Sequence, residues 1–200
     1  MQVLSLNKTA LNSEKTQLET YTRFLPSLEL KRDQLLVERT RAARHLADTQ
    51  RALKEIIAAT GEDLPMLANQ GVDLAGLAAV DSVNIGRERR LGMDLPVLEK
   101  IEVRVKDYAC LSTPHWVDAV ALRLQEAMEL IIRQQVESER LALLERALKK
   151  VNQRINLFEK VLIPETRQNV KVIQIALADA EKAAVVRAKL AKRKRGSTTT

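Results

Sequence analysis

Apolar residues recur at alternating spacings of three and four in the last third of the chain, and this ladder constrains the fold more than any other feature. Its unbroken part comprises Leu141, Leu144, Leu148, Val151, Ile155, Phe158 and Leu162. Such spacing places one apolar stripe along an α-helix and favours supercoiled pairing with a second helix. Because a single amphipathic helix is only marginally stable in water, we expect this helix to pack on another helix of the chain.

A second ladder of the same kind occupies roughly residues 7 to 59. Its two series, each with a seven-residue spacing, are Leu4, Leu11, Leu18, Leu25, Leu46 and Leu53, and Tyr21, Leu28, Leu35, Ala42, Thr49 and Ile56. Arg32 and Arg39 interrupt this stripe, and we expect them to extend to solvent or to contact something outside the helix pair, because buried charge is costly. Pro26 predicts a kink or a helix restart. Thr60 and Gly61 predict the helix end, with the glycine left-handed.

The C-terminal helix is expected to be the longest element. Thr113 and Pro114 form a typical helix start, with proline at the first helical position. The stripe begins at Val117, Val120, Leu124, Ala127 and Ile131 and slips in register near Ser138. Beyond Pro164, which we expect to bend the helix, it moves by one residue to Val170, Ile173, Leu177, Ala180 and Ala184. The two ladders together predict a rod-like antiparallel coiled coil with both chain ends at one tip.

The middle of the chain has a different composition and contains five of the six glycines. Residues 101 to 106 alternate strictly between apolar and charged, which indicates a half-buried strand, and residues 80 to 85 could pair with it. Residues 86 to 96 would then form a long basic turn. We expect a β-hairpin head at the far end of the coiled coil, leaning on the helices or on another subunit. The predicted parts are a helix at 1–60, a head at 61–112, a helix at 113–195 and a disordered tail at 196–200.

Composition supports an all-α dominated protein. Aromatic residues make up only 2% of the chain, which argues against a β-sandwich, a barrel or a large compact core. Cys110 is the one cysteine, so no internal disulfide forms and a reducing compartment is expected. The first ten residues do not resemble a signal peptide, and no apolar run is long enough to cross a membrane.

The residue patterns that support catalysis are missing from the sequence. The glycines form neither a P-loop nor a dinucleotide fingerprint, and His45 and His115 have no metal-ligand spacing around them. No general base accompanies Cys110. We therefore predict no catalytic, cofactor-binding or metal-binding residue. Basic clusters at 87–90 and 189–195 invite a nucleic-acid interpretation, but stacking aromatics are missing, so we predict no nucleic-acid partner.

Four segments resemble the D subunits of the V-type (vacuolar/archaeal-type) rotary ATPases. Residues 153–164, QRINLFEKVLIP, are similar to that family's Arg-Arg-Val-Asn-Ala-Leu-Glu followed by an apolar run ending in Ile-Pro. Residues 187–192 resemble its Arg-Leu-Lys-x-x-Lys, residues 7–11 its opening Pro-Thr-Arg-Met-Asn-Leu, and residues 31–35 its Lys-Arg-Asp-Ala-Leu. The resemblance spans nearly the whole chain.

The resemblance implies a non-catalytic central rotor shaft, cytoplasmic and peripheral to the membrane, without inserting into it. In that family the terminal helices enter a hexamer of catalytic A and nucleotide-binding B subunits, and the head meets the small F subunit and a socket subunit on the membrane ring. Expected hexamer-contacting residues are Leu4, Leu11, Leu18, Arg187, Lys189, Lys192 and Arg193. Expected head contacts are Val83, Ile85, Ile101, Val103 and Val105. Expected helix-packing residues are Leu28, Leu35, Leu144, Leu148, Val151, Ile155, Phe158 and Leu162.

Two other classes of protein share part of this pattern. A prefoldin-like coiled-coil chaperone or a type III export stalk protein also uses two long helices with a small tip or none. A shaft binds a hexameric ATPase once, whereas a prefoldin-like protein forms its own oligomer, so stoichiometry separates them. An anonymous coiled-coil scaffold explains the ladders but not the internal Ile163-Pro164 with its Asn and Glu neighbours.

Overall fold

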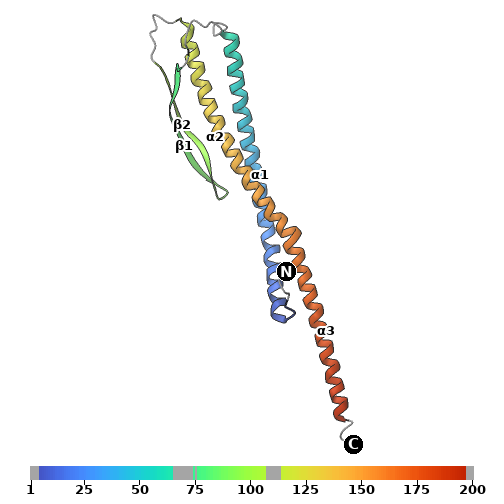
Figure 1. The fold of residues 1–200 in the computed structure, drawn as a ribbon. Helices are drawn as coiled ribbons and strands as arrows, with labels where there is room; N and C mark the ends of the chain where they lie inside the picture. The colour runs from blue at the N-terminus through green and yellow to red at the C-terminus, as the bar shows by residue number, and fades with distance from the viewer. Residues whose placement is uncertain (1–4, 65–73, 75, 107–113, 197–200) are drawn as a thin grey trace. The chain divides into compact units, whose positions relative to one another are not determined.

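A computed structural model describes residues 5–64, 74, 76–106 and 114–196, with side chains up to residue 194. The elements are helix α1 (Lys8–Asp63), strands β1 (Ala78–Arg90) and β2 (Met93–Val105), helix α2 (Trp116–Leu157), the π-helical turn η2 (Phe158–Leu162) and helix α3 (Ile163–Gly196) (Figure 1). The chain divides into two compact units, residues 1–32 with 150–200 and residues 33–149. The predicted class is confirmed: long N- and C-terminal helices pack together, with one antiparallel β-hairpin between them in sequence.

In the unit of residues 33–149, α1 and α2 pack antiparallel around a narrow apolar core. Arg39 donates a hydrogen bond to Glu145 at 3.0 Å, and Arg123 donates one to Asp63 at 3.4 Å, so residue numbers fall in α2 as they rise in α1. Leu35 and Leu144 are 0% and 1% exposed. As expected, Arg39 extends toward solvent, and 43% of its side chain is exposed. Its guanidinium extends to a carboxylate of α2 at the edge of the pair, which satisfies the charge without burying it.

The hairpin is longer than expected and its turn is tighter. β1 and β2 pair from Ala78 opposite Val105 to Arg90 opposite Met93. The turn is therefore only Leu91 and Gly92, with φ angles of 53° and 76°. Two positive φ angles are typical of a type I′ turn, whose twist matches that of the flanking strands. The predicted basic turn at 86–96 is wrong because most of it continues the strands.

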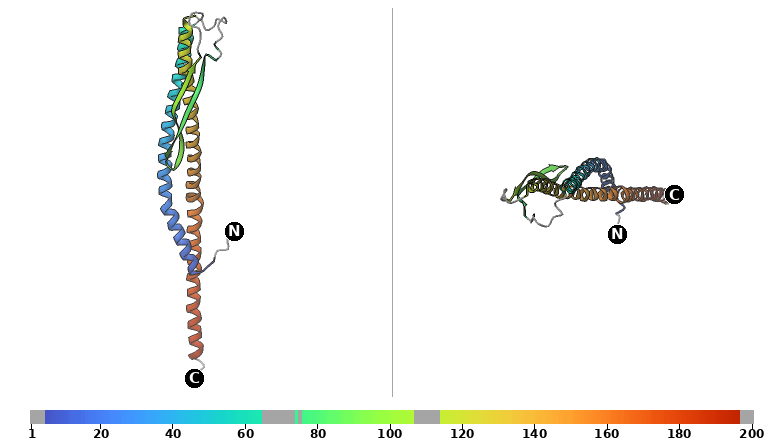
Figure 2. Two further views of the ribbon diagram at one scale, coloured as in Figure 1. Left: turned by 90° about the vertical axis from the view of Figure 1, so that its left-hand side faces the viewer. Right: turned by 90° about the horizontal axis from the view of Figure 1, so that it is seen from above.

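The hairpin folds back along the helices of its own unit. Leu77, just before β1, packs with Val117, Val120 and Ala121 of α2, and Val105 packs against this group. At the other end of the hairpin, Arg140 of α2 donates a hydrogen bond to Glu88. These contacts lie 23 residues apart on α2, about 35 Å at 1.5 Å per residue, and Figures 1 and 2 both draw the hairpin beside α2. The expectation that the hairpin leans on the helices is confirmed: its base packs on the first turns of α2, and charged and apolar contacts hold the rest of it alongside that helix.

The other unit pairs the start of α1 with the end of α2, η2 and α3. The Tyr21 and Phe158 rings meet edge to face with centroids 5.4 Å apart, and Asn169 donates a hydrogen bond to Glu14 at 3.4 Å. The direction is again antiparallel. Its buried apolar residues are Val151, Ile155, Val170 and Ile173. Within this unit, the first turns of α1 thus lie beside the early part of α3.

A π-helical turn accounts for the shift of the apolar stripe near Pro164. The Ile163 N–H bonds to the Phe158 carbonyl, one residue further back than in an α-helix. A π-turn adds one residue to the helix, so the stripe resumes one position later. Thr166, Val170 and Ile173 are accordingly buried. Proline lacks a donor and its ring crowds the preceding carbonyls, which explains why the wider turn lies immediately before it.

Some helix boundaries differ from those expected. Of the kink or restart expected at Pro26, the restart is wrong, because α1 runs through this proline without interruption. It also continues past Gly61 to Asp63, and Leu64 donates to the Thr60 carbonyl, so Gly61 needs no left-handed conformation. α2 begins at Trp116, whereas the expected cap at Thr113 lies outside the described residues. None of the described helices combines the length and hydropathy needed to span a bilayer.

Candidate partner-contact surfaces

The expected helix-packing residues lie on the inner sides of their helices. Four of them are buried: Leu35, Leu144, Val151 and Ile155. The other four are half-buried: Leu28, Leu148, Phe158 and Leu162. These positions hold the helix pairs together, and the remaining candidate residues depend on that framework for their placement.

The last part of α3 has no cover within the described chain. Leu177 is the last half-buried residue, and every residue from Ala178 to Lys194 is exposed. This segment, the α3 end (residues 178–194), includes three apolar side chains that are more than half exposed: Val185, Val186 and Leu190. It also carries Arg187, Lys189, Lys192 and Arg193 of the expected hexamer contacts, all exposed.

The N-terminal members of that expected contact set have a different environment. Leu11 and Leu18 are half-buried on the stripe of α1, and Leu4 lies outside the described residues. Leu11 and Leu18 therefore contribute to helix packing, in contrast to the fully exposed basic residues of the α3 end. Spacing alone could not separate these roles, because both sets belong to regular helical patterns.

One face of the hairpin is apolar and open. Cross-strand pairing joins Val80 to Val103, Val83 to Ile101 and Ala78 to Val105. Val80, Val83 and Ile85 are 42%, 38% and 49% exposed, while Ile101, Val103 and Val105 are half-buried. Directly paired residues point to the same face of a sheet, so these six side chains share one face, which is half-buried on β2 and open on β1. We call the open β1 part, Val80, Val83 and Ile85, the outer hairpin face. Adjacent exposed apolar residues on one face make this surface a candidate for contact with another protein.

A group of ion pairs, here called the tip clamp, fixes the hairpin tip to both helices of its unit. It comprises Glu38, Glu88, Arg90 and Arg140. Arg90 donates to Glu38 of α1 at 3.0 Å and to neighbouring Glu88, and Arg140 of α2 donates to the other oxygen of Glu88 at 3.0 Å. Isolated surface pairs stabilise little, but a shared network holds its members in one geometry. The tip clamp therefore holds the hairpin tip against both helices.

The sequence alone does not reveal this network. Arg90 stands with Arg87 and Arg89 in a basic cluster, and Glu88 between them is easily overlooked. The available signal is the alternation of Glu88 and Arg90, which puts both on one face of a strand. Their partners on α1 and α2 are about 50 residues away in sequence, so only tertiary structure could identify them.

The pKa of the Glu88 carboxyl lies below its ordinary value of 4.5, mainly because Arg90 and then Arg140 donate hydrogen bonds to it. A carboxyl whose pKa is lowered by folding stabilises the fold above pH 4.5, and that contribution disappears as pH falls through the lowered pKa. We expect Arg140→Gln to raise the pKa of Glu88 toward 4.5 in an NMR titration of its carboxyl carbon. Arg133→Gln, on the same helix, is the control and should leave it unchanged. A midpoint at or above 4.5 in the unaltered chain would contradict the tip clamp.

The exposed surfaces of the described chain are suited to binding. Within the described ranges, no group of three or more His, Cys, Asp and Glu side chains could hold a metal ion. The features that stand out are an uncovered basic helix end and an uncovered apolar hairpin face. Fold and surfaces together define a protein of paired long helices that offers docking surfaces to other proteins.

Comparison with known proteins identifies the family. The family model for the D subunit of ATP synthase matches residues 10–193. The chain is 35% identical over 197 residues to the V-type ATP synthase D subunit of Chlamydia abortus, covering 96% of this chain and 93% of that protein. It is 33% identical over 196 residues to that of Chlamydia caviae, with the same coverage, and 32% identical over 197 residues to that of Borreliella burgdorferi, covering 96% and 95%. The chain belongs to the family of V-type ATP synthase D subunits, the central stalk components of rotary ATPases.

Proposed function

We propose that this protein is a non-catalytic rotor shaft that couples ATP hydrolysis or synthesis in a hexamer of A and B subunits to ion translocation. An asymmetric helix pair inside a ring of three equivalent catalytic interfaces meets each interface with a different side. Catalytic states can then follow the angle of the shaft through unequal contacts. In this role the protein is cytoplasmic and peripheral to the membrane, and the nucleotide chemistry belongs to the hexamer.

The exposure of the α3 end carries this proposal. A lone helix with uncovered Val185, Val186 and Leu190 gains little from burial within its own chain, so a partner that covers it would stabilise it. Its basic residues suit acidic loops, which would lie on the inner surface of the hexamer. We therefore assign the α3 end to the contact with the A and B subunits.

The outer hairpin face is our candidate contact for the F subunit or for the socket subunit on the membrane ring. Val83→Asp places a charge in the middle of this face without disturbing the helices. We expect it to weaken binding of the F subunit by about 2 kcal/mol, or roughly 30-fold, in calorimetric titration of the purified chain. Asn84→Asp, on the opposite face of the same strand, is the matched control and should change affinity little. Equal affinities for the two variants would remove the F subunit from this face.

Stoichiometry tests the proposal as a whole. The tagged protein, purified at native levels, should bring down the A and B subunits with one copy of itself per hexamer. An oligomer of the chain alone, without A and B, would instead support the chaperone-like alternative. Native mass spectrometry of the purified assembly gives the ratio directly.

A further inference from the structure

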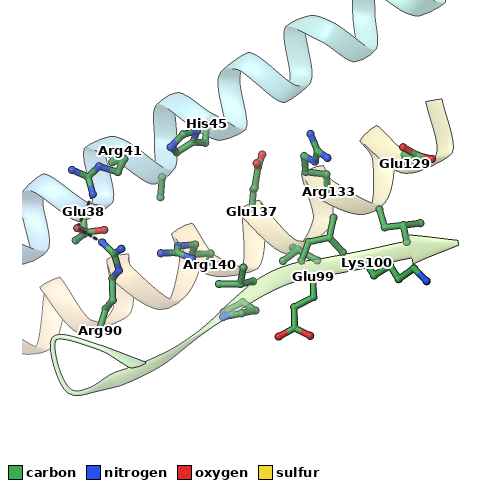
Figure 3. A pocket seen from close by; sticks show the side chains of 16 residues that line it. Glu38, Arg41, His45, Arg90, Glu99, Lys100, Glu129, Arg133, Glu137 and Arg140 are labelled. Carbon is green, nitrogen blue, oxygen red and sulfur yellow. Dashed lines mark hydrogen bonds and ion pairs between the residues drawn. The ribbon is translucent and has the colours of Figure 1, made fainter. Parts of the chain in front are cut away.

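A long cavity lies between the middle of the hairpin and the two helices of the same unit (Figure 3). Its volume is about 480 Å³, and its lining extends along α2 from Glu129 to Arg140 and along β2 from Pro96 to Ile101. Eleven residues of α-helix span about 16 Å, so the cavity is elongated in the direction of the strand. Its volume falls in the range of about 300–1,000 Å³ that is common for binding sites.

The edge of β2 forms one wall of this cavity. Six consecutive residues, 96 to 101, line it. Successive side chains of a strand point to opposite faces. Six consecutive residues can therefore line one cavity only where the strand turns its edge toward that cavity. This edge has no neighbouring strand among the described residues, because the sheet contains β1 and β2 alone. In the part of the chain that is described, no backbone hydrogen bond joins these six residues to a segment outside the hairpin.

The twist of the hairpin explains why its edge turns inward here. Leu95, near the tip, is fully buried, and Val105, at the base, packs on the Leu77 group. These residues would share a face in a regular strand, but the pairing has an extra residue in β2 near Glu99. Opposite faces of β2 therefore meet the helices at its two ends. Between these ends, the edge of β2 faces the helices.

On the α2 wall of the cavity, Glu129 and Glu137 flank Arg133, and one carboxylate oxygen has no donor among the described residues. The tip clamp accounts for Glu38, Arg90 and Arg140, whereas Glu129, Arg133 and Glu137 of α2 form no ion pair with the residues that the structure describes. Oε2 of Glu137 is buried without any hydrogen-bond partner in the described chain. Figure 3 draws these three side chains on one side of α2, while Glu99 points away from the helices. A buried carboxylate oxygen without a donor costs about 1–3 kcal/mol, so Glu137 favours an incoming hydrogen-bond donor such as a lysine or arginine side chain.

We infer that the cavity receives an extended segment of a protein partner, which pairs with the open edge of β2 and places a lysine or arginine against Glu129 and Glu137. Strand addition to an open edge provides backbone hydrogen bonds, and the side-chain pocket provides selectivity. The inference rests on the proposed function in that the partner is another component of the rotary complex.

Hydrogen exchange on the assembled complex tests this inference. Amides of residues 97–101 should exchange roughly ten times more slowly, or slower still, in the complex than in the isolated chain, because strand pairing protects them. The double variant Glu129→Gln/Glu137→Gln should restore fast exchange in the complex. Glu139→Gln, an exposed position on the same helix, is the matched control and should keep the protection.

Several results would overturn the inference. Unprotected amides in the complex would show that no strand is added, and protection that survives the double variant would show that no cation holds it. Protection that grows with concentration of the isolated chain would assign the cavity to a second copy. If Val83→Asp releases the F subunit while residues 97–101 stay unprotected, the outer hairpin face stands and only the cavity proposal fails. If Val83→Asp leaves F-subunit binding unchanged and residues 97–101 stay unprotected in the complex, both the outer hairpin face and the cavity proposal fail.

Discussion

Removal of residues 178–200 should leave the fold intact and uncouple the complex. No described residue from 178 to 194 is buried, so the truncated chain should melt within a few degrees of the intact one. Coupling free energies between sites are about 1–3 kcal/mol, or roughly 5- to 150-fold. We therefore expect ion pumping per ATP hydrolysed to fall by about tenfold in reconstituted vesicles, while ATP hydrolysis continues.

A charge variant distinguishes the effect of the basic side chains of the α3 end from the effect of the helix itself. Replacement of Arg187, Lys189, Lys192 and Arg193 by glutamine keeps the helix length and removes four positive charges. Because charge attraction draws these residues to the hexamer in the proposed contact, this variant should lose part of the coupling. High ionic strength should reduce coupling more in the unaltered chain than in the variant, since salt screens only the charges that are present. Unchanged pumping in the truncated chain would refute the role of the α3 end in the contact with the A and B subunits.

The largest loss of stability is expected for Leu35→Ala. Leu35 is fully buried between α1 and its partner, and truncation of such a leucine costs about 2–5 kcal/mol because it removes apolar contacts and leaves a cavity. Leu36, next in sequence, is 42% exposed and provides a control with identical chemistry. We expect Leu36→Ala to change the free energy of unfolding by about 1 kcal/mol or less. Urea unfolding of the purified chain measures both.

Equal destabilisation by the two substitutions would contradict the packing of this helix pair. Equal slopes against urea would be needed for the comparison, because a change in slope indicates a changed unfolded state rather than a changed core. The pair also tests the seven-residue spacing itself, since Leu35 lies on the predicted stripe and Leu36 does not.

Helical periodicity predicted the buried side of the long helices reliably. Every described member of the two N-terminal series, from Leu11 to Ile56, is buried or half-buried. Even the one-residue shift beyond Pro164 was visible, although its cause, the π-turn at Phe158–Leu162, was not. Periodicity works here because the stripe must face a partner helix over its whole length, which repeats the same requirement many times.

Local signals near the helix ends and in the hairpin were less reliable. Gly61 and Pro26 are poor helix residues, yet α1 continues through both, since each costs a few kcal/mol at most and the flanking stripe outweighs it. The long basic segment at 86–96 suggested a loop. It forms strand because the type I′ turn at Leu91–Gly92 allows pairing to continue to the tip.

The sequence by itself determined the two paired helices, the hairpin between them and, through its motifs, the family. Repeated local patterns contain that information, because each turn of helix and each residue pair of the strand restates it. Only the tertiary structure decided where the hairpin lies, that Glu38, Glu88, Arg90 and Arg140 meet at its tip, and that Glu137 is left without a donor in the described chain. Those facts depend on contacts between residues about 50 positions apart, and no periodicity encodes which single side chains meet across such a distance.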